Sequence, residues 1–142
     1  MHTADNVILN KSAVIENCMR RIRQENEAIS SPNDFTHIDA MILNIERMCQ
    51  AAIDIAMHLC GVQHLGIPQN SGQAFDLLYS HRRITESVKN CMKGMVGFRN
   101  VAIHEYNELD QSVVKWITSD GLRDIQQFLS EIGVTIVIPD QK

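Results

Sequence analysis

A chain of 142 residues is long enough to form one domain with a hydrophobic core of its own. Its composition, with 44% hydrophobic and only 5% aromatic residues, is typical of an ordinary soluble helical protein. The net charge of −4 excludes a protein that coats nucleic acid through an overall positive charge. Any contact with nucleic acid would therefore depend on a local group of basic residues.

The apolar runs, the N-terminal sequence and the cysteine spacing together bear on the cellular compartment of the protein. No run approaches the roughly 18 consecutive apolar residues that span a bilayer, and the N-terminal sequence MHTADNVILNKS has no basic region followed by an apolar one. The four cysteines form no CxxC pair: Cys18, Cys49, Cys60 and Cys91. This spacing favours free thiols in a reducing compartment, with Cys49 and Cys60 on one helix face in the core, and predicts a cytoplasmic protein.

The first predicted helix runs from about residue 5 to 29. Isoleucine recurs every seven residues along it, which predicts one buried seam: Ile8, Ile15, Ile22 and Ile29. The sequence Ser30-Ser31-Pro32 then breaks the helix. We expect Ser31 to cap the next helix, with Pro32 at its first position and Asp34 in its first turn.

The second predicted helix has the most regular pattern, with apolar residues at alternating steps of three and four: Ile38, Met41, Ile45, Met48, Ala52, Ile55 and Leu59. This spacing is typical of a helix that packs nearly parallel or antiparallel to its neighbours in a bundle. The helix should end near Gly61. Gly66, Pro68 and Gly72 indicate an irregular connector, followed by a short helix from Gln73 to about Ser80.

Two more helices complete the prediction. One begins with Ile84, Val88, Cys91 or Met92, and Met95, and should stop at Asn107, which can cap the next one. The apolar positions of the last helix are Val114, Ile117, Gly121, Ile125, Phe128 and Ile132. The tail at 134–138 (VTIVI) is β-prone but too short to found a sheet. We therefore expect one all-α domain over residues 1–142, an up-down bundle of four main helices plus one short helix, with an irregular or extended tail from about 133.

The end of the fourth predicted helix carries the run RNVAIHEY, residues 99–106. On a helix, Arg99 and Tyr106 lie within about 20° of each other, and Asn100 and His104 within about 40°, so two neighbouring rows result. Arg99 and His104 are about 140° apart, so their head groups converge only if the Arg side chain swings or the helix distorts. Gly94 and Gly97 would ease such distortion, or the close approach of a second helix.

These residue types suit cleavage of a phosphodiester. A guanidinium binds two phosphate oxygens and stays charged, so Arg99 could stabilise a phosphorane-like transition state. His104 could move protons near neutral pH, and Asn100 could orient the imidazole or donate to a phosphate. The spacing equally fits an ordinary structural role, in which Arg99 pairs with Glu105 or another carboxylate and His104 packs or caps.

The motif, the chain length and the helix order together resemble a known family, the HEPN-domain toxins of the HepT type. These belong to bacterial type II toxin–antitoxin pairs whose antitoxin is a minimal nucleotidyltransferase. The resemblance covers most of the chain and implies a HEPN-like helical bundle. It also implies a metal-independent endoribonuclease that needs no cofactor and leaves a 2′,3′-cyclic phosphate, with two subunits pairing so that their motif helices face each other across an RNA-binding cleft.

The resemblance assigns roles to individual residues. Arg99 and His104 match the two catalytic positions, and Asn100 matches the polar residue that often follows the Arg. Tyr106 matches the tyrosine that the partner antitoxin modifies with AMP, which would place a phosphate beside Arg99 and block the cleft. Two copies of Arg99, with Arg82 and Arg83 as further candidate RNA-binding residues, would concentrate positive potential in one groove of an acidic dimer.

Other interpretations stay open at this point. The chain could be a non-catalytic HEPN module that binds nucleotide or serves a nucleotidyltransferase partner, or a purely structural bundle. His58, Cys60 and His64 carry metal-ligand atoms, but no fourth ligand has suitable spacing, so we expect no metal site. Glu46 and Asp54 on the second predicted helix either reach the cleft or face water.

Overall fold

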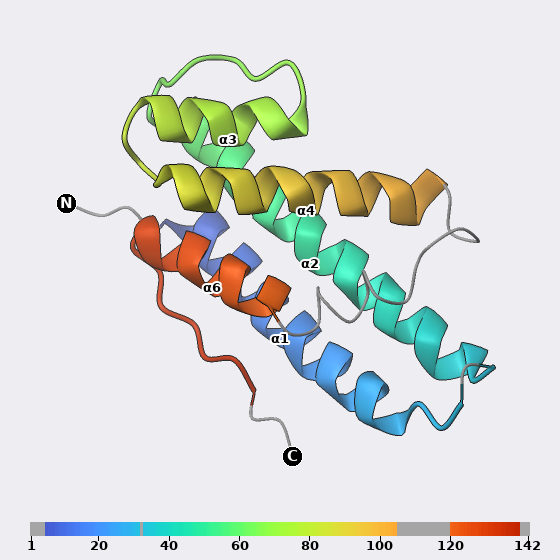
Figure 1. The fold of residues 1–142 in the computed structure, drawn as a ribbon. Coiled ribbons are helices and arrows are strands. Elements are labelled where there is room, and N and C mark those ends of the chain that lie inside the picture. Colours follow the sequence, from blue (N-terminus) through green and yellow to red (C-terminus); the bar gives the residue numbers. More distant parts are fainter. Residues whose placement is uncertain (1–4, 32, 105–119, 140–142) are drawn as a thin grey trace.

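The computed structural model of the protein describes residues 5–31, 33–104 and 120–139, and for 101–104 it describes the helical backbone alone. All regular structure within these ranges is helical, which confirms the expected all-α bundle (Figure 1). The helices are α1 (Asn6–Ala28), α2 (Phe35–Val62), α3 (Ser71–Ser80), α4 (Glu86–His104) and α6 (Leu122–Glu131). None of them is both long and apolar enough to cross a membrane, as far as the described residues go.

Helix α1 follows its isoleucine repeat. Ile8, Ile15 and Ile22 are completely buried, and Ile29, just past the helix end, is partly buried against the same core. The helix begins where Asp5 accepts a hydrogen bond from the backbone N–H of Ile8 (3.0 Å), an N-cap that satisfies one of the free amides of the first turn. The predicted seam is therefore confirmed, because a sevenfold repeat keeps one face of a helix in the core.

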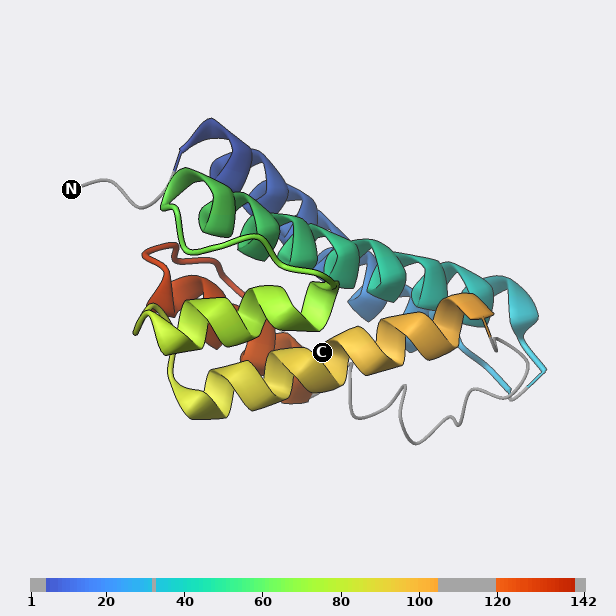
Figure 2. The same cartoon turned by 90° about the horizontal axis from the view of Figure 1, so that it is seen from above.

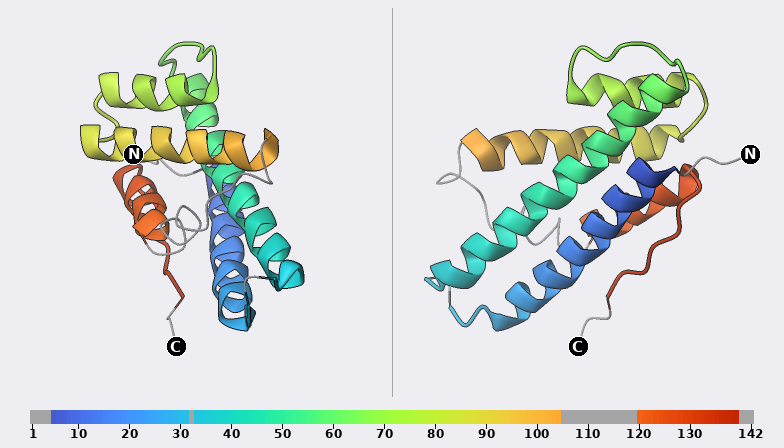
Figure 3. Two further views of the ribbon diagram at one scale, coloured as in Figure 1. Left: turned by 45° about the vertical axis from the view of Figure 1, so that its right-hand side comes forward. Right: turned by 180° about the vertical axis from the view of Figure 1, so that it is seen from behind.

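Helices α1 and α2 lie side by side and antiparallel (Figure 3). Three polar pairs join them along their length: Asp5 with His58 (2.6 Å), Lys11 with Asp54 (3.0 Å), and Glu25 with His37 (2.6 Å). The stripe predicted on α2 is buried from Met41 to Leu59. Apolar packing supplies the main stabilisation of such a pair, while the polar pairs at its edges fix how the two helices are aligned.

Helices α3 and α4 lie together on one side of α2, as the view from above shows (Figure 2). Lys93 of α4 binds Asp76 of α3 (3.0 Å), and Phe75 of α3 meets Phe128 of α6 edge to face, with ring centroids 5.4 Å apart. Both aromatic rings are fully buried. One hydrophobic core thus joins the α1/α2 pair to α3, α4 and α6.

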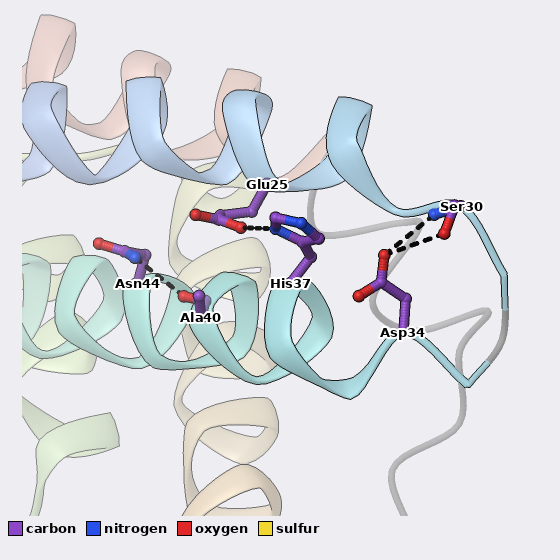
Figure 4. Close-up of polar contacts among 6 residues, drawn as sticks. All are labelled: Glu25, Ser30, Asp34, His37, Ala40 and Asn44. Carbon is purple, nitrogen blue, oxygen red and sulfur yellow. Dashed lines mark hydrogen bonds and ion pairs between the residues drawn. The ribbon is translucent and has the colours of Figure 1, made fainter.

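The turn between α1 and α2 differs from the prediction (Figure 4). Helix α2 begins at Phe35 with Asp34 as its N-cap residue, so Ser31 does not cap it and Asp34 is not in its first turn. The Asp34 carboxylate instead accepts hydrogen bonds from the backbone N–H and the hydroxyl of Ser30, both 3.2 Å, while the Ser31 hydroxyl accepts from the N–H of Asn33. These local side-chain contacts stabilise a turn over the residues that were expected to start the helix. Pro32 lies outside the described residues.

The connector between α2 and α3 is irregular, as expected, but shorter than expected. Helix α3 begins at Ser71, so Gly72 lies inside the helix, because Asn70 caps it by accepting from the N–H of Gln73 (2.9 Å). Gly66 has a φ of +126°, where a side chain would be strained and its Cβ would come within 3.3 Å of Leu77. This glycine lets the chain reverse tightly against α3.

Helix α6 ends in a left-handed turn at Gly133 (φ +94°), and the tail then packs back onto the bundle. Val134 and Ile136 are buried, and the Ile136 carbonyl accepts from the side chain of Gln126 (3.1 Å). The tail runs beside α1 (Figure 3) and forms no strand in its described part, as the prediction had it. Three other positions used in the prediction, Asn107, Val114 and Ile117, lie outside the described residues.

The pair between Glu25 and His37 makes the stability of this fold depend on pH. The hydrogen bond to Glu25 raises the pKa of His37, with Asp34 adding to the effect and partial burial opposing it. A raised folded-state pKa means that the stabilisation is fully present below the unfolded value of about 6.5 and is lost as the pH rises through the folded value. Chemical denaturation of wild type and His37→Gln should therefore show a larger difference in unfolding free energy at pH 5.5 than at pH 8.5.

The matched control is His81→Gln, since the His81 ring contacts the carbonyl of Leu77 (2.9 Å) and, over the residues that the structure describes, no carboxylate. Its stability difference from wild type should not shrink between the two pH values. Equal differences at both pH values for His37→Gln would contradict the assigned role of the Glu25 pair.

Candidate functional site

Helix α4 is continuous through the start of the motif and ends at His104. Gly94 and Gly97 are exposed, and a Cβ added at either would meet nothing within 4 Å. The helix therefore carries an open glycine face, and no other helix of the described chain packs against it. Of the two roles expected for these glycines, close approach of another helix is not seen among the described helices of this chain.

Arg99 is half-buried and fixed from two sides. Its Nη1 donates to Oδ1 of Asn100 (2.9 Å) and its Nη2 donates to Oε1 of Gln50 on α2 (2.5 Å). Its Nε is buried and has no hydrogen-bond partner among the described residues. The contact with Asn100 joins two positions that are about 100° apart around the helix. Convergence of Arg99 with His104 stays a prediction, because the His104 side chain lies outside those described.

A buried thiol lies near enough to Arg99 to feel its charge. Cys49 is completely buried next to Gln50, and this burial raises the pKa of its thiol to about 12, although the nearby Arg99 charge lowers it somewhat. The thiol therefore stays protonated and unreactive, which agrees with core packing for Cys49. Cys60 is likewise buried, and its sulfur lies 3.6 Å from the carbonyl oxygen of Ala74, to which it donates.

Gln50 is the residue of this site that the sequence did not reveal. Its side-chain Nε2 donates to Oδ1 of Asp54 one turn later (2.8 Å), and Oδ2 of Asp54 binds Lys11 of α1 (3.0 Å). Asp54 therefore neither faces water alone nor touches Arg99 directly, but is connected to it through Gln50. The spacing of Gln50 and Asp54, four apart beside the buried stripe, was visible, but nothing in the sequence indicated where α4 would cross α2.

The remaining candidates are not all brought together. His104 is the last residue of α4, five positions after Arg99, and Tyr106 and Glu105 lie outside the described residues. Arg82 and Arg83 lie before the other end of α4, and Glu86 at that end is about 20 Å from Arg99 at 1.5 Å rise per residue. The structure thus separates these two arginines from Arg99 within one subunit.

Arg83 is also engaged locally, because its Nε donates to Oε1 of Gln63 (2.7 Å) and its Nη1 to the carbonyl of His81 (2.8 Å). Arg82 is exposed at the tip of the turn, in a left-handed conformation with φ of +59°. Any contribution of these residues to RNA binding would come from a surface separate from Arg99 in the same subunit.

The potential metal ligands are dispersed. His58 binds the Asp5 carboxylate and holds the pKa of that carboxyl below its usual value, and Cys60 points into the core. Over residues 5–31, 33–104 and 120–139, no three His, Cys, Asp or Glu side chains group in a way that could hold a metal ion.

The arrangement can do one kind of chemistry well. A guanidinium held by two neutral amide oxygens keeps its full positive charge and retains N–H groups for an anion. Placed on the same helix as an imidazole, it suits a reaction in which negative charge develops on a phosphate.

Comparison with known proteins agrees with this chemistry. Residues 12–132 match the family model described as Ribonuclease HepT-like. The mRNA nuclease HepT of Shewanella oneidensis is 41% identical over 129 residues, which cover 90% of this chain and 97% of that protein.

Two solved structures share the fold. One is a tri-AMPylated HEPN toxin of Shewanella oneidensis in complex with MNT antitoxin, 41% identical with a TM-score of 0.84 over 91% of this chain and 98% of that one. The other is a toxin–antitoxin crystal structure with AMP-PNP, 40% identical with a TM-score of 0.85 over 91% and 99% of the two chains. The helical fold, the motif on α4 and these similarities agree: the chain belongs to the ribonuclease HepT-like family of HEPN proteins.

Proposed function

We propose that this protein is the toxin of a bacterial toxin–antitoxin pair. It is an endoribonuclease that cleaves RNA with Arg99 and His104, and a nucleotidyltransferase antitoxin neutralises it by transferring AMP to Tyr106. The family match and the 41% identical mRNA nuclease confirm the class of enzyme expected from the sequence. The observation that carries the proposed site is the Arg99 guanidinium, half-buried and held by Gln50 and Asn100 on the helix that also carries His104.

The reaction follows from these two groups. His104 takes the proton of a ribose 2′-hydroxyl, the 2′-oxygen bonds to phosphorus, and the bond to the 5′-oxygen breaks as that oxygen receives a proton from water. His104 afterwards releases its proton to water. Arg99 stabilises the extra negative charge on the phosphorane. The products are a 2′,3′-cyclic phosphate and a 5′-hydroxyl. The guanidinium supplies the positive charge and the imidazole moves the proton, so the proposed reaction needs no metal ion.

Removal of either group should abolish most activity. We expect Arg99→Ala and His104→Ala to lower the rate of cleavage of a defined RNA by about 10²-fold or more, as for lost charge stabilisation and lost acid–base catalysis. Cleavage by wild type should survive excess EDTA and yield cyclic phosphate ends. The control is Arg20→Ala, because Arg20 is exposed on α1 and contacts Asn17 (2.9 Å). Folded Arg99→Ala and His104→Ala proteins that cleave RNA like wild type would overturn the proposed site, whereas wild type that cleaves no RNA would favour the non-catalytic HEPN module.

The chain offers a matched control for the proposed switch, since it has only two tyrosines, Tyr79 and Tyr106. Tyr79 lies on α3, 38% exposed, with the Lys89 ammonium 4.6 Å from its ring centre. Incubation with the partner nucleotidyltransferase and ATP should add adenylate to wild type and to Tyr79→Phe, but not to Tyr106→Phe, as read by intact mass. Tyr106→Phe should still cleave RNA and should resist neutralisation by adenylation. Equal adenylation of all three proteins would place the modification elsewhere.

We further propose that two subunits pair through α4 and so form the RNA cleft. The open space beside Gly94 and Gly97 supports this, because a helix of a second copy could approach closely there. Two copies of Arg99 would then give an acidic protein one strongly positive groove.

This pairing can be tested without damaging the subunit. Since a side chain at Gly94 meets no atom within 4 Å, Gly94→Leu should fold at least as well as wild type, gaining up to about 1 kcal/mol in helix propensity. It should nevertheless shift sedimentation from dimer toward monomer and lower RNA cleavage. Gly61→Leu is the control, because Gly61 has equally open surroundings near the end of α2. A Gly94→Leu protein that stays dimeric would contradict pairing through this face.

A further inference from the structure

Arg99 depends on a residue 49 positions away for its orientation. Of the guanidinium donors, Nη2 is bound by Gln50, Nη1 is bound by the neighbouring Asn100, and the buried Nε has no partner in the described part of the chain. Asn100 is exposed and sits on the same helix, so it turns with α4. Among the described residues, Gln50 is the contact that fixes the guanidinium relative to the other helices, because it lies on α2.

The Gln50 amide is itself held with a definite polarity. An ionised carboxylate only accepts hydrogen bonds, so Asp54 can bind the NH₂ end of the amide and not its oxygen. The oxygen end is thereby directed to Arg99, which only donates. Lys11 binds the second carboxylate oxygen of Asp54 and holds that group in place from α1.

The chain of contacts therefore runs Lys11, Asp54, Gln50, Arg99 and joins α1, α2 and α4. The positions of the charged and neutral groups along this chain of contacts affect how Arg99 can bind an anionic substrate. A carboxylate at position 50 would neutralise Arg99 through an ion pair, whereas a neutral amide holds the guanidinium and leaves its positive charge available. The negative charge of Asp54 is placed one residue further away and is balanced by Lys11.

We propose that Gln50 is a positioning residue for RNA cleavage: its amide, oriented by Asp54 and Lys11, holds the Arg99 guanidinium in the geometry that meets the phosphate. Gln50 does not touch the substrate. The proposal rests on the proposed catalytic role of Arg99, and it adds that the role requires an uncharged acceptor on α2.

Two substitutions at one position separate positioning from simple packing. Gln50→Ala removes the acceptor and should lower kcat for a defined RNA about tenfold to a hundredfold, the cost of a misplaced catalytic group, with KM changed less than about threefold. Gln50→Glu keeps the size and still accepts from Arg99, so a merely structural role predicts near wild-type activity. Positioning by a neutral acceptor predicts a comparable loss of kcat for Gln50→Glu, because the new carboxylate pairs with Arg99 and faces Asp54.

Lys11, at the opposite end of this chain of contacts from Arg99, has a matched control substitution. Lys11 and Lys93 are similarly exposed, 40% and 44%, and each lies 3.0 Å from an aspartate, but Lys93 binds Asp76 away from Arg99. Lys11→Met should lower kcat several-fold, and Lys93→Met should leave it unchanged. Equal effects of the two substitutions would remove Lys11 and Asp54 from the proposal.

A direct measurement keeps this test independent of activity. In ¹⁵N NMR spectra of the full chain, the Arg99 Nε–H signal, identified by its loss in Arg99→Ala, should be sharp in wild type and in Gln50→Glu. It should broaden or move toward the position of exposed arginines in Gln50→Ala. An unchanged signal in Gln50→Ala would overturn the proposal, even if that protein were less stable.

The outcomes distinguish the two levels of inference. If Arg99→Ala cleaves RNA like wild type, the proposed function fails, and positioning for catalysis fails with it, whatever the NMR signal shows. If Arg99→Ala is inactive while Gln50→Ala keeps kcat within about twofold of wild type, the proposed function stands and the positioning role of Gln50 is overturned.

Discussion

The antiparallel pairing of α1 and α2 is the constraint on which the rest of the structure depends. Its isoleucine seam is completely buried at Ile8, Ile15 and Ile22, and polar pairs at both ends and in the middle align the two helices. Because the alignment is fixed, Lys11 comes opposite Asp54, and Gln50 one turn earlier is presented to α4 as that helix crosses α2 (Figure 1). Packing between α1 and α2, which carry no proposed catalytic group, thus determines where the Arg99 side chain is held.

Much of this fold could be predicted from the sequence because apolar spacing alone determines which face of a helix is buried. The seam of α1 and the stripe of α2 needed no knowledge of the partner helix. The residues at which helices begin and end were harder to predict. Ser31 and Asp34 both have the chemistry of an N-cap, and the choice between them depended on hydrogen bonds to Ser30 and Asn33 that only the folded turn displays.

The candidate site was predictable only in part, for a related reason. Arg99, Asn100 and His104 are close in sequence, and the structure shows Arg99 in contact with Asn100. Convergence of the Arg99 and His104 head groups stays a prediction, because the His104 side chain lies outside those described. Gln50 is far away in sequence, and its contact with Arg99 depends on the crossing of α4 over α2. That crossing is determined by the shapes of side chains in the core, which spacing does not encode. Arg82 and Arg83 lie before the start of α4, far along the helix from Arg99, so a groove shared with Arg99 stays a prediction about two paired subunits.

The charge of the whole chain gives these local contacts their importance. A protein with a net charge of −4 repels RNA at long range, so binding and catalysis have to depend on a few cations that are not neutralised by their surroundings. Lys11 and Lys93 are each paired with an aspartate, whereas Arg99 is held by two amide oxygens near a thiol that stays protonated. Within the described part of the chain no carboxylate pairs with Arg99, which leaves its charge available to a phosphate. In the proposed function that phosphate belongs either to the RNA backbone or to AMP on Tyr106. Because one guanidinium would attract both, adenylation would inhibit by occupying the same electrostatic site that the substrate needs.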